Sequence, residues 1–531
     1  MRDFQLAGRS TVHAVNGMAA TSHPLATLAA LDALRWGGNA IDAAVCAAAV
    51  LAVVEPQSTG IGGDCFVLFA PRGSGQIVAY NGSGRAPAAA DATWFRDKGI
   101  ARIEPDSPHS VTVPGAIEAW TRLVADHGRK GLDDLLLPAI DFAEKGYPVH
   151  PRVASDWHRE AAKLARDPEA KRIFLPGGQA PAAGDLHAQP ELAATLKRIA
   201  AEGADAFYRG EVAEDLVGRL RALGGLQTVD DFAAHAGEYV TPIRTSYRGT
   251  DVFECPPNGQ GLTVLMMLDI LEGFDLAKLD PLGAERLHLE IEAGRLAYRD
   301  RNALIADPAH ARVPVAHLLS AAYADGLRSR IRPERAMARL PAPGSTELEG
   351  RDTVYLCVVD GQHNAVSFIN STYWSFGSGI VGPKSGVVLH NRGTGFVLDP
   401  RHPNVIAPRK RPFHTIIPGM LARDGRAIMP FGVMGGSYQP FGHVHLLTNL
   451  LDHGMDPQEA LDLARVFHRD DNVVVERGVP EASRAGLVAR GHKVVEADEP
   501  LGGGQAILID WKRGVLTGGS DPRKDGCALG Y

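Results

Sequence analysis

The apolar positions near the start of the chain predict two buried helices. The longest apolar stretch, Ala40 to Val54, is rich in alanine and is too short to cross a bilayer. Asn39 before it and Glu55-Pro56 after it predict where this helix begins and ends. A preceding helix is expected to be capped by Ser22 and to end at Gly37-Gly38.

The pattern changes along the rest of the chain. Residues 115–235 are rich in helical patterns, and residues 285–302 predict a long amphipathic helix. Beyond residue 352, β-branched runs separated by turn signals predict strands, and helices return at about 440–452 and 456–466. This mixture, without internal repeats, indicates an α+β protein with one large layered core.

A threonine stands where an exposed linker meets a predicted strand. Residues 333–350 hold three prolines and two glycines and have no sustained apolar period, which is typical of a linker. The run Val354 to Val359 predicts a strand, with a turn and a second strand after it. If the chain were cut after Asp352, the hydroxyl of Thr353 would be a nucleophile and its new α-amine a base. From this segment alone, a threonine that merely begins a hairpin is the simpler interpretation.

Composition narrows the classes of function. The 531 residues are 45% hydrophobic and 22% charged, as in an ordinary globular protein. A net charge of −7 argues against nucleic-acid and acidic-membrane partners. The N-terminal residues do not resemble a signal peptide, so a cytoplasmic location is expected. Five cysteines without CxxC spacing predict buried free thiols.

The sequence gives little support to a dinucleotide-binding enzyme or to a metallohydrolase. The glycine loop at 60–63 leads into a predicted strand, whereas a dinucleotide site needs a loop that leads from a strand into a helix. His443 and His445 are two residues apart on a predicted helix and so face different sides, and the sequence has no HExxH. We therefore expect neither a cofactor nor a metal.

Seven short motifs resemble, in order, those of the γ-glutamyltransferase (glutathione hydrolase) family of N-terminal-nucleophile hydrolases. Each motif would be weak alone, but together they extend over almost the whole chain. They are GGNAIDAAVCAAAVLAVVEPQSTGIGGDCF at 37–66, SVTVPGAIEAW at 110–120, TVYLCVVDGQHNAVSF at 353–368, FGSGIV at 376–381, KRPFHTIIP at 410–418, MGGSYQP at 434–440 and SDPRKDGCALGY at 520–531.

The resemblance implies a four-layer αββα sandwich and autocatalytic cleavage between Asp352 and Thr353. Residues 1–352 would form a large chain and residues 353–531 a small chain that starts with the nucleophile. Both would share one αββα core and remain associated as a heterodimer, with further dimerisation left open.

The resemblance also assigns catalytic roles to four positions. Thr353 matches the family's nucleophile. Ser371 falls where the family has a threonine that hydrogen-bonds the nucleophile, and a turn serine is the plainer interpretation of it. Gly435 and Gly436 match the glycines whose backbone amides form the oxyanion hole, where only a residue without a side chain lets the backbone come so close.

Several positions that hold a γ-glutamyl group in the family differ here. Ser83 stands at the place of an arginine that binds the substrate's α-carboxylate. Arg85, two residues on and on the same face of a strand, is expected to supply that charge from a shifted position and, with Arg392, to bind the carboxylate end of the substrate. Tyr373, followed by Trp374, replaces an asparagine that helps to hold the α-amine. Pairing of Arg85 with a nearby acid on the surface is the plainer interpretation of that residue.

The changes continue in the later motifs. Arg392 and Gly395 replace a glutamine and an acidic residue of the amine pocket. His414 and Thr415 replace a pair of serines. Because an ammonium group needs acceptors and negative charge, a pocket that gains Arg392 is unfavourable for it. Surface pairing of Arg392 with an acid is the alternative.

The sequence therefore favours an autoprocessing amide hydrolase that works through an acyl-enzyme. Its substrate is expected to be a small amide that bears a carboxylate, similar to oxamate or to a glutaryl amide. One alternative is a γ-glutamyltransferase or glutathione hydrolase with a variant pocket. Another is an uncleaved, non-catalytic binding protein, which would give one band on a denaturing gel where the enzyme gives two.

Overall fold

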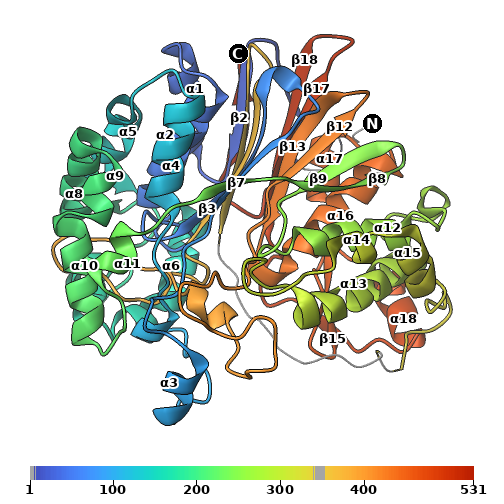
Figure 1. Ribbon diagram of the computed structural model, residues 1–531. Helices are drawn as coiled ribbons and strands as arrows, with labels where there is room; N and C mark the ends of the chain where they lie inside the picture. Colours follow the sequence, from blue (N-terminus) through green and yellow to red (C-terminus); the bar gives the residue numbers. More distant parts are fainter. Residues whose placement is uncertain (1–4, 6–7, 339, 341–352) are drawn as a thin grey trace.

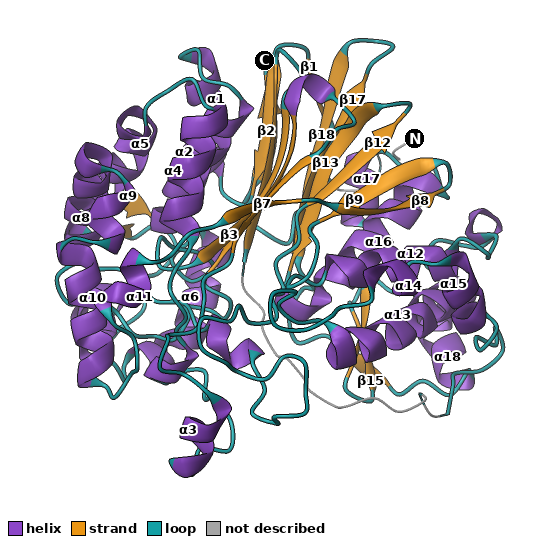
Figure 2. Cartoon of the chain, in the orientation of Figure 1, coloured by secondary structure: helices purple, strands orange, loops and turns teal. Residues whose placement is uncertain are grey.

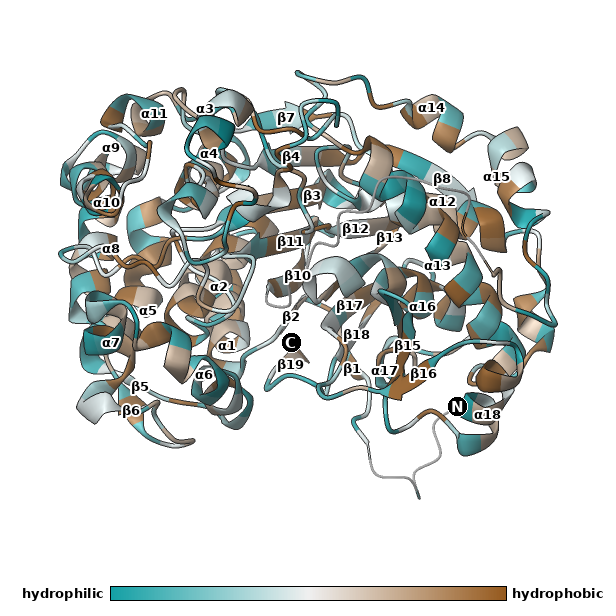
Figure 3. Cartoon of the chain, turned by 90° about the horizontal axis from the view of Figure 1, so that it is seen from below, coloured by the Kyte–Doolittle hydropathy of each residue, from teal (hydrophilic) through white to brown (hydrophobic). Residues whose placement is uncertain are grey.

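Two seven-stranded antiparallel sheets lie at the centre of the molecule, with a layer of helices outside each (Figures 1 and 2). The structure is a computed structural model and describes residues 5, 8–338, 340 and 353–531. Figure 3 shows the same order of layers from below. The expected α+β fold, a four-layer αββα sandwich, is confirmed.

Each sheet contains strands from both the early and the late part of the chain. The first sheet runs in the order β1 (Val12–Ala14), β18 (Val515–Ser520), β17 (Gly503–Asp510), β13 (Arg426–Met434), β12 (Gly419–Arg423), β9 (Thr250–Glu254), β8 (Ile243–Tyr247). The second runs in the order β19 (Cys527–Gly530), β2 (Gly17–Thr21), β10 (Val354–Asp360), β11 (Ala365–Ser371), β3 (Asp64–Ala70), β4 (Val78–Gly82), β7 (Glu238–Val240).

The helices that cover the second sheet come from the first part of the chain (Figure 1). They are α1 (Pro24–Arg35), α2 (Ala40–Val54), α4 (Ala116–His127), α5 (Leu132–Lys145), α6 (Pro151–Leu164), α7 (Pro168–Phe174), α8 (Pro190–Glu202), α9 (Ala204–Tyr208), α10 (Glu211–Ala222) and α11 (Val229–Ala233). This layer includes the ribbon β5 (Tyr147–Pro148) and β6 (Leu186–His187), while α3 (Ala92–Asp97) projects from the sandwich.

The other helical layer covers the first sheet. Its helices are α12 (Gly261–Leu271), α13 (Ala284–Leu304), α14 (Val315–Leu318), α15 (Ala321–Arg328), α16 (Gln439–Leu451), α17 (Pro457–Asp462) and α18 (Glu481–Ala489). A small sheet of β14 (Val466–Arg469), β15 (Asn472–Val475) and β16 (Val494–Glu496) lies beside α13 and α18.

Three apolar cores separate the four layers. Met18, Phe66 and Tyr355 of the second sheet meet Met420 and Ile507 of the first sheet in the core between the sheets. A second core lies between α2 and the second sheet, and a third between α12, α16 and the first sheet. Burial of apolar surface on both faces explains why both sheets hold near-continuous apolar runs rather than alternating ones.

Most of the sequence-predicted elements are found. Helix α2 begins at Asn39, which forms a capping box with Asp42, and ends at Glu55 as expected. Helix α1 is capped by His23 rather than by Ser22, because the His23 side chain accepts from the N–H of Leu25. The helix expected at 456–466 is shorter, since α17 ends at Asp462 and β14 follows.

The sequence predicted free, buried cysteines and an apolar helix at 40–54 that is too short to cross a bilayer. All five cysteines are free, and four of them are buried. Within the described ranges, every helix is too short or too polar to cross a bilayer.

Candidate active site

Thr353 is fully buried and immediately precedes β10. Its Oγ1 lies 3.1 Å from the Oγ of Ser371, the last residue of β11. The two strands pair with Val354 opposite Asn370, so the hairpin brings both hydroxyls to one end of the sheet. A neighbouring hydroxyl at this distance can hold the Thr353 oxygen in one orientation.

The turn of this hairpin is held by a buried carboxylate. Asp360 accepts hydrogen bonds from the backbone N–H of Gln362 at 2.8 Å and of Asn364 at 3.0 Å. It also accepts from the Asn364 side chain at 2.8 Å and from the N–H of Ala40, the first residue of α2, at 3.0 Å. Because the turn fixes the pairing register, Asp360 also fixes the approach of the two hydroxyls at the far end.

The loop after β11 contains two aromatic residues, Tyr373 and Trp374, next to Ser371. The N–H of Tyr373 donates to the Ser371 hydroxyl at 2.8 Å, and Tyr373 is held at a φ of 80°. Such a conformation costs about 1–3 kcal/mol in a residue with a side chain, so its surroundings must hold it there. The N–H of Trp374 donates to the side chain of Asn391 at 3.2 Å, which joins this loop to the segment of Arg392.

Arg392 is a buried cation with unused hydrogen-bond donors. It begins the 3₁₀ turn Arg392–Gly395, and its guanidinium lies 3.8 Å from the centre of the Tyr373 ring. Nη1 donates to the Thr415 hydroxyl at 2.8 Å, while Nε and Nη2 have no partner among the described residues. Burial lowers the pKa of Arg392 to about 10, so the group remains charged at neutral pH. A buried charge with free N–H groups is a strong binding site for an anion.

Asp64 supplies a negative charge that compensates Arg392, but it makes no hydrogen bond to Nε or Nη2 of Arg392 among the described contacts. Its carboxylate accepts from the N–H groups of Gly84 and Gly115, both at 3.1 Å, and from His414 Nε2 at 3.0 Å. Burial alone would raise the pKa of Asp64, but His390, His414 and Arg392 hold it below its ordinary value. Burial and Arg392 lower the pKa of His414 to about 3, so this imidazole is neutral.

Gly435 and Gly436 lie at the junction of β13 and the 3₁₀ turn that precedes α16. Their φ angles of 124° and 57° are strained for any residue with a side chain. They lead into a 3₁₀ turn, Gly436–Tyr438, followed by α16, and the first N–H groups of such a start lack helical acceptors. Gln260 Nε2 donates to the carbonyls of Gly436 at 2.9 Å and of Thr415 at 2.7 Å.

Comparison with known proteins shows the family of the chain. The family model described as gamma-glutamyltranspeptidase matches residues 26–531. The chain belongs to this family. It is therefore an N-terminal-nucleophile hydrolase, an enzyme class whose named members include hydrolases, amidohydrolases and acylases.

Relatives with different named activities match along almost their whole length. A glutathione hydrolase-like YwrD proenzyme of Bacillus subtilis (strain 168) is 38% identical, covering 97% of this chain and 98% of the relative. The oxamate amidohydrolase proenzyme of Klebsiella pneumoniae is 36% identical, with the same coverage of 97% and 98%. A cephalosporin acylase structure from Bacillus halodurans superposes with a TM-score of 0.93 at 42% identity, covering 100% of this chain and 99% of that one.

A series of contacts joins nearly all the site residues expected from the family resemblance. It runs from Thr353 through Ser371, Tyr373, Arg392 and Thr415, and then through Gln260 to Gly436. The N–H of Trp374 binds Asn391, which precedes Arg392 in the chain. His414 binds Asp64, and Gly435 directly precedes Gly436. Asp352 lies outside the described residues.

Arg85 has different neighbours from the other expected pocket residues. Its Nη1 donates to the carbonyl of Arg409 at 3.2 Å and lies 3.7 Å from Asp307. Its side chain is 31% exposed, whereas Arg392 is fully buried. Ser83, at the family arginine's place, is buried and accepts from the Asn258 side chain at 3.1 Å. The geometry thus favours Arg392 over Arg85 as an anion ligand.

Sequence reasoning missed three polar residues of the site. Asp64 follows the glycine loop directly. A carboxylate at the start of an otherwise apolar strand could have indicated a buried functional residue. Gln260 and Arg301 come from a loop and from α13, and no local pattern points to them. Arg301 is buried, donates to Gln260 Oε1 at 2.9 Å, and stacks on Tyr298 at 4.0 Å.

Proposed function

We propose that this enzyme matures by cleavage between Asp352 and Thr353 and then hydrolyses small amides whose acyl group carries a carboxylate but no ammonium. Residues 1–352 and 353–531 would be its large and small chains. The observation that carries the substrate class is Arg392, a fully buried guanidinium of which two nitrogen atoms have no partner in the part of the chain that the structure describes. It is two contacts away from Ser371, the hydroxyl partner of Thr353.

Maturation creates the catalytic base. The Thr353 hydroxyl attacks the carbonyl carbon of Asp352, the peptide C–N bond breaks, and an ester to the threonine oxygen forms. Water hydrolyses this ester, which leaves a carboxyl group on Asp352 and a free α-amine on Thr353. An unperturbed α-amine has a pKa of about 7.7–8.0 and accepts a proton near neutral pH, whereas the earlier amide nitrogen could not.

Turnover repeats the same chemistry on a separate amide. The α-amine of Thr353 accepts the proton of the Thr353 hydroxyl while the hydroxyl oxygen attacks the substrate carbonyl. The protonated α-amine then gives this proton to the amine that leaves the substrate. The acyl group remains as an ester on Thr353 until water, deprotonated by the same amine, releases the acid. Backbone N–H groups of Gly435 and Gly436 would stabilise the oxyanion in both steps, each typically worth about 10²–10³ in rate.

The charges around Arg392 favour a carboxylate over a γ-glutamyl head group. A substrate carboxylate can accept from Nε and Nη2 of Arg392 beside the Thr415 hydroxyl, with Tyr373 and Trp374 forming the adjacent wall. Arg85 could assist only by leaving Asp307. An α-ammonium would face the Arg392 cation, and the Asp64 carboxylate is already occupied by His414 and two backbone N–H groups.

The names of relatives support both this proposal and its main competitor. Oxamate is an amide that bears a carboxylate, and an enzyme named for its hydrolysis is 36% identical to this chain. The relative at 38% identity is named glutathione hydrolase-like, and the Escherichia coli (strain K12) glutathione hydrolase proenzyme is 32% identical. Ordinary glutathione hydrolysis with a variant pocket is therefore the function against which the proposal must be tested.

A matched pair of substrates tests the proposal. Glutaryl-p-nitroanilide and γ-glutamyl-p-nitroanilide differ only in the α-ammonium group. We expect kcat/KM to favour the glutaryl compound by about tenfold or more, the value of one charged hydrogen-bonding interaction. Equal or faster cleavage of the γ-glutamyl compound would identify a glutathione hydrolase with a variant site. One uncleaved band and no turnover of either compound, or of oxamate, would identify a binding protein.

A further inference from the structure

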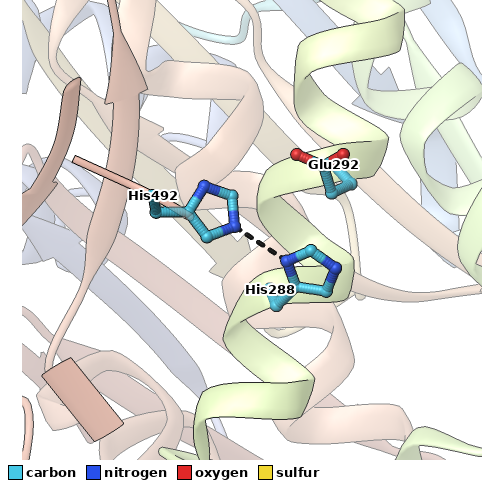
Figure 4. A group of neighbouring side chains, drawn as sticks. All are labelled: His288, Glu292 and His492. Carbon is cyan, nitrogen blue, oxygen red and sulfur yellow. Dashed lines mark hydrogen bonds between the residues drawn. The ribbon is translucent and has the colours of Figure 1, made fainter. Parts of the chain in front are cut away.

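A buried group of two imidazoles and a carboxylate lies in the helical layer outside the first sheet (Figure 4). His288 and Glu292 are one turn apart on α13 and so share a face, and His492 reaches them from the loop after α18. The nitrogen and oxygen atoms that could act as ligands all lie within 4.8 Å of one another. No step of the amide hydrolysis uses these residues.

The hydrogen bonds orient both imidazoles toward the same point. His288 Nε2 lies 2.8 Å from the carbonyl of Arg332, which can only accept, so His288 Nδ1 carries a lone pair. That atom lies 2.7 Å from His492 Nε2. Within the described chain His492 Nδ1 has no hydrogen-bond partner, so it can hold the ring's proton when Nε2 binds another atom. A histidine fixed by a carbonyl on its outer nitrogen is the usual arrangement of a metal ligand.

Glu292 provides the negative charge. One oxygen accepts from the N–H of Met337 at 2.8 Å, and the other lies 2.6 Å from Arg295. A carboxylate offers about four acceptor positions, so a further bond can be added without losing the one to Met337. Arg295 is the competitor for this charge. Its side chain is 13% exposed, so it has a route toward solvent.

The same residues hold the root of the segment that leads to Thr353. His288 binds the carbonyl of Arg332 and Glu292 binds the N–H of Met337. Between these points, Arg490 donates to the carbonyl of Pro333 at 2.9 Å and accepts from the N–H of Ala336 at 2.7 Å. A ligand that joined His288, Glu292 and His492 would therefore lock α13, the loop after α18 and residues 332–337 together.

We propose that His288, Glu292 and His492 bind a transition-metal dication of the zinc class. Two imidazole nitrogens and one carboxylate suit zinc rather than calcium or magnesium, which prefer an all-oxygen shell. The ion would replace the hydrogen bond between the two rings, and a water molecule or the second carboxylate oxygen would complete four ligands. Its role would be structural, because it cross-links segments that are far apart in the sequence.

Binding can be measured on the full-length protein after chelator treatment and dialysis. Titration with Zn²⁺ in a calorimeter should give one ion per chain, and Co²⁺ should give the intense visible absorption of a tetrahedral site. His288→Asn and His492→Asn should weaken Zn²⁺ binding by more than the ~10–100-fold that loss of an outer-shell partner causes. His453→Gln, a half-buried histidine at the end of α16, is the matched control and should bind as the wild type does.

The variant Arg295→Gln is expected to strengthen Zn²⁺ binding, whereas the histidine variants weaken it. Removing a cation that competes for Glu292 should tighten Zn²⁺ binding by about tenfold or more, because like charges close together repel strongly when partly buried. This outcome does not depend on the histidine variants folding. The proposal is overturned if the wild type binds no Zn²⁺, if the two histidine variants bind it as well as His453→Gln does, or if Arg295→Gln leaves the affinity unchanged.

Discussion

At the residue scale, the decisive feature is the charge balance between Arg392 and Asp64. Each is fully buried, yet they share no direct ion pair among the described contacts, because Asp64 is occupied by His414 and two N–H groups. The Tyr373 ring and the Thr415 hydroxyl hold the guanidinium in place, and two of its donor atoms have no partner in the described ranges of the chain. A buried charge left in this state is costly unless a ligand completes it.

Arg392→Gln should separate substrate recognition from chemistry. We expect normal maturation, because the attack by Thr353 does not involve this side chain. The kcat/KM for glutaryl-p-nitroanilide should fall about 10–100-fold, the value of a charge-assisted contact with a carboxylate. Turnover of acetyl-p-nitroanilide, which has no carboxylate, is the control and should change little. An equal loss on both substrates would mean that Arg392 supports the fold of the site rather than the substrate.

Asp64→Asn should destabilise the fold in a pH-dependent manner. The Asp64 carboxyl has a pKa below its ordinary value, so its contribution is present above about pH 4 and is lost as the pH falls further. Loss of the charge also weakens the buried hydrogen bonds that His414 and two N–H groups donate to it, and hydrogen bonds to a charged group are typically worth about 1.5–3 kcal/mol each. Urea unfolding of uncleaved Thr353→Ala protein should show this difference at neutral pH and a smaller one in acid. Asp399→Asn, an exposed carboxylate paired with Arg401, is the control. A difference that persists unchanged in acid would contradict this account.

At the scale of elements, the site depends on one hairpin that the sequence predicted well. The β-branched run after Thr353 and the turn that follows are local signals, so β10, β11 and the Thr353–Ser371 end could be anticipated. Helix α13 was also expected, but not its surroundings. Its charged side chains Arg286, Glu290 and Glu292 are buried, Arg286 against α16 and Glu292 against Met337, so the amphipathic interpretation was wrong on its polar face.

Contacts between distant segments account for what the sequence could not predict about the site. Gln260 reaches the carbonyl of Gly436, and Arg301 reaches Gln260, only through the fold. The likeness to known motifs placed Arg392 in the pocket, but its stacking on Tyr373 depends on a left-handed backbone that no propensity predicts. The two histidines and the carboxylate of the proposed metal site are likewise brought together from α13 and the loop after α18.

Asp360→Ala should impair maturation from the far end of the hairpin. Removing this carboxylate leaves the N–H groups of Ala40, Gln362 and Asn364 without their acceptor, at a cost of about 1–3 kcal/mol for each that remains buried. A looser turn lets the register of Thr353 and Ser371 fluctuate, so self-cleavage should slow several-fold. Asp424→Ala, in the exposed turn between β12 and β13, is the control. Cleavage at the wild-type rate would show that the turn does not set the register.

At the scale of the whole molecule, the two parts of the chain are interleaved. In the second sheet, β10 and β11 lie between β2 and β3, and β19 pairs with β2 at the edge. In the first sheet, β9 pairs with β12 and β1 with β18. Neither residues 1–352 nor residues 353–531 could form a complete sheet alone.

The two chains of the matured enzyme should therefore stay associated without a covalent bond. They should elute together in size-exclusion chromatography and separate only in denaturant, because parting them would expose all three apolar cores. Elution of a free small chain from native matured enzyme would be inconsistent with this topology.

The mass of the purified protein under denaturing conditions tests the central claim most directly. If Thr353 is the nucleophile that cleavage creates, active protein should give two masses, one for residues 1–352 and one for residues 353–531 that begins with Thr353. The Thr353→Ala protein should give a single full-length mass. Active protein that remains full-length, or that is cut at any other bond, would contradict the assignment of Thr353 and the mechanism built on it.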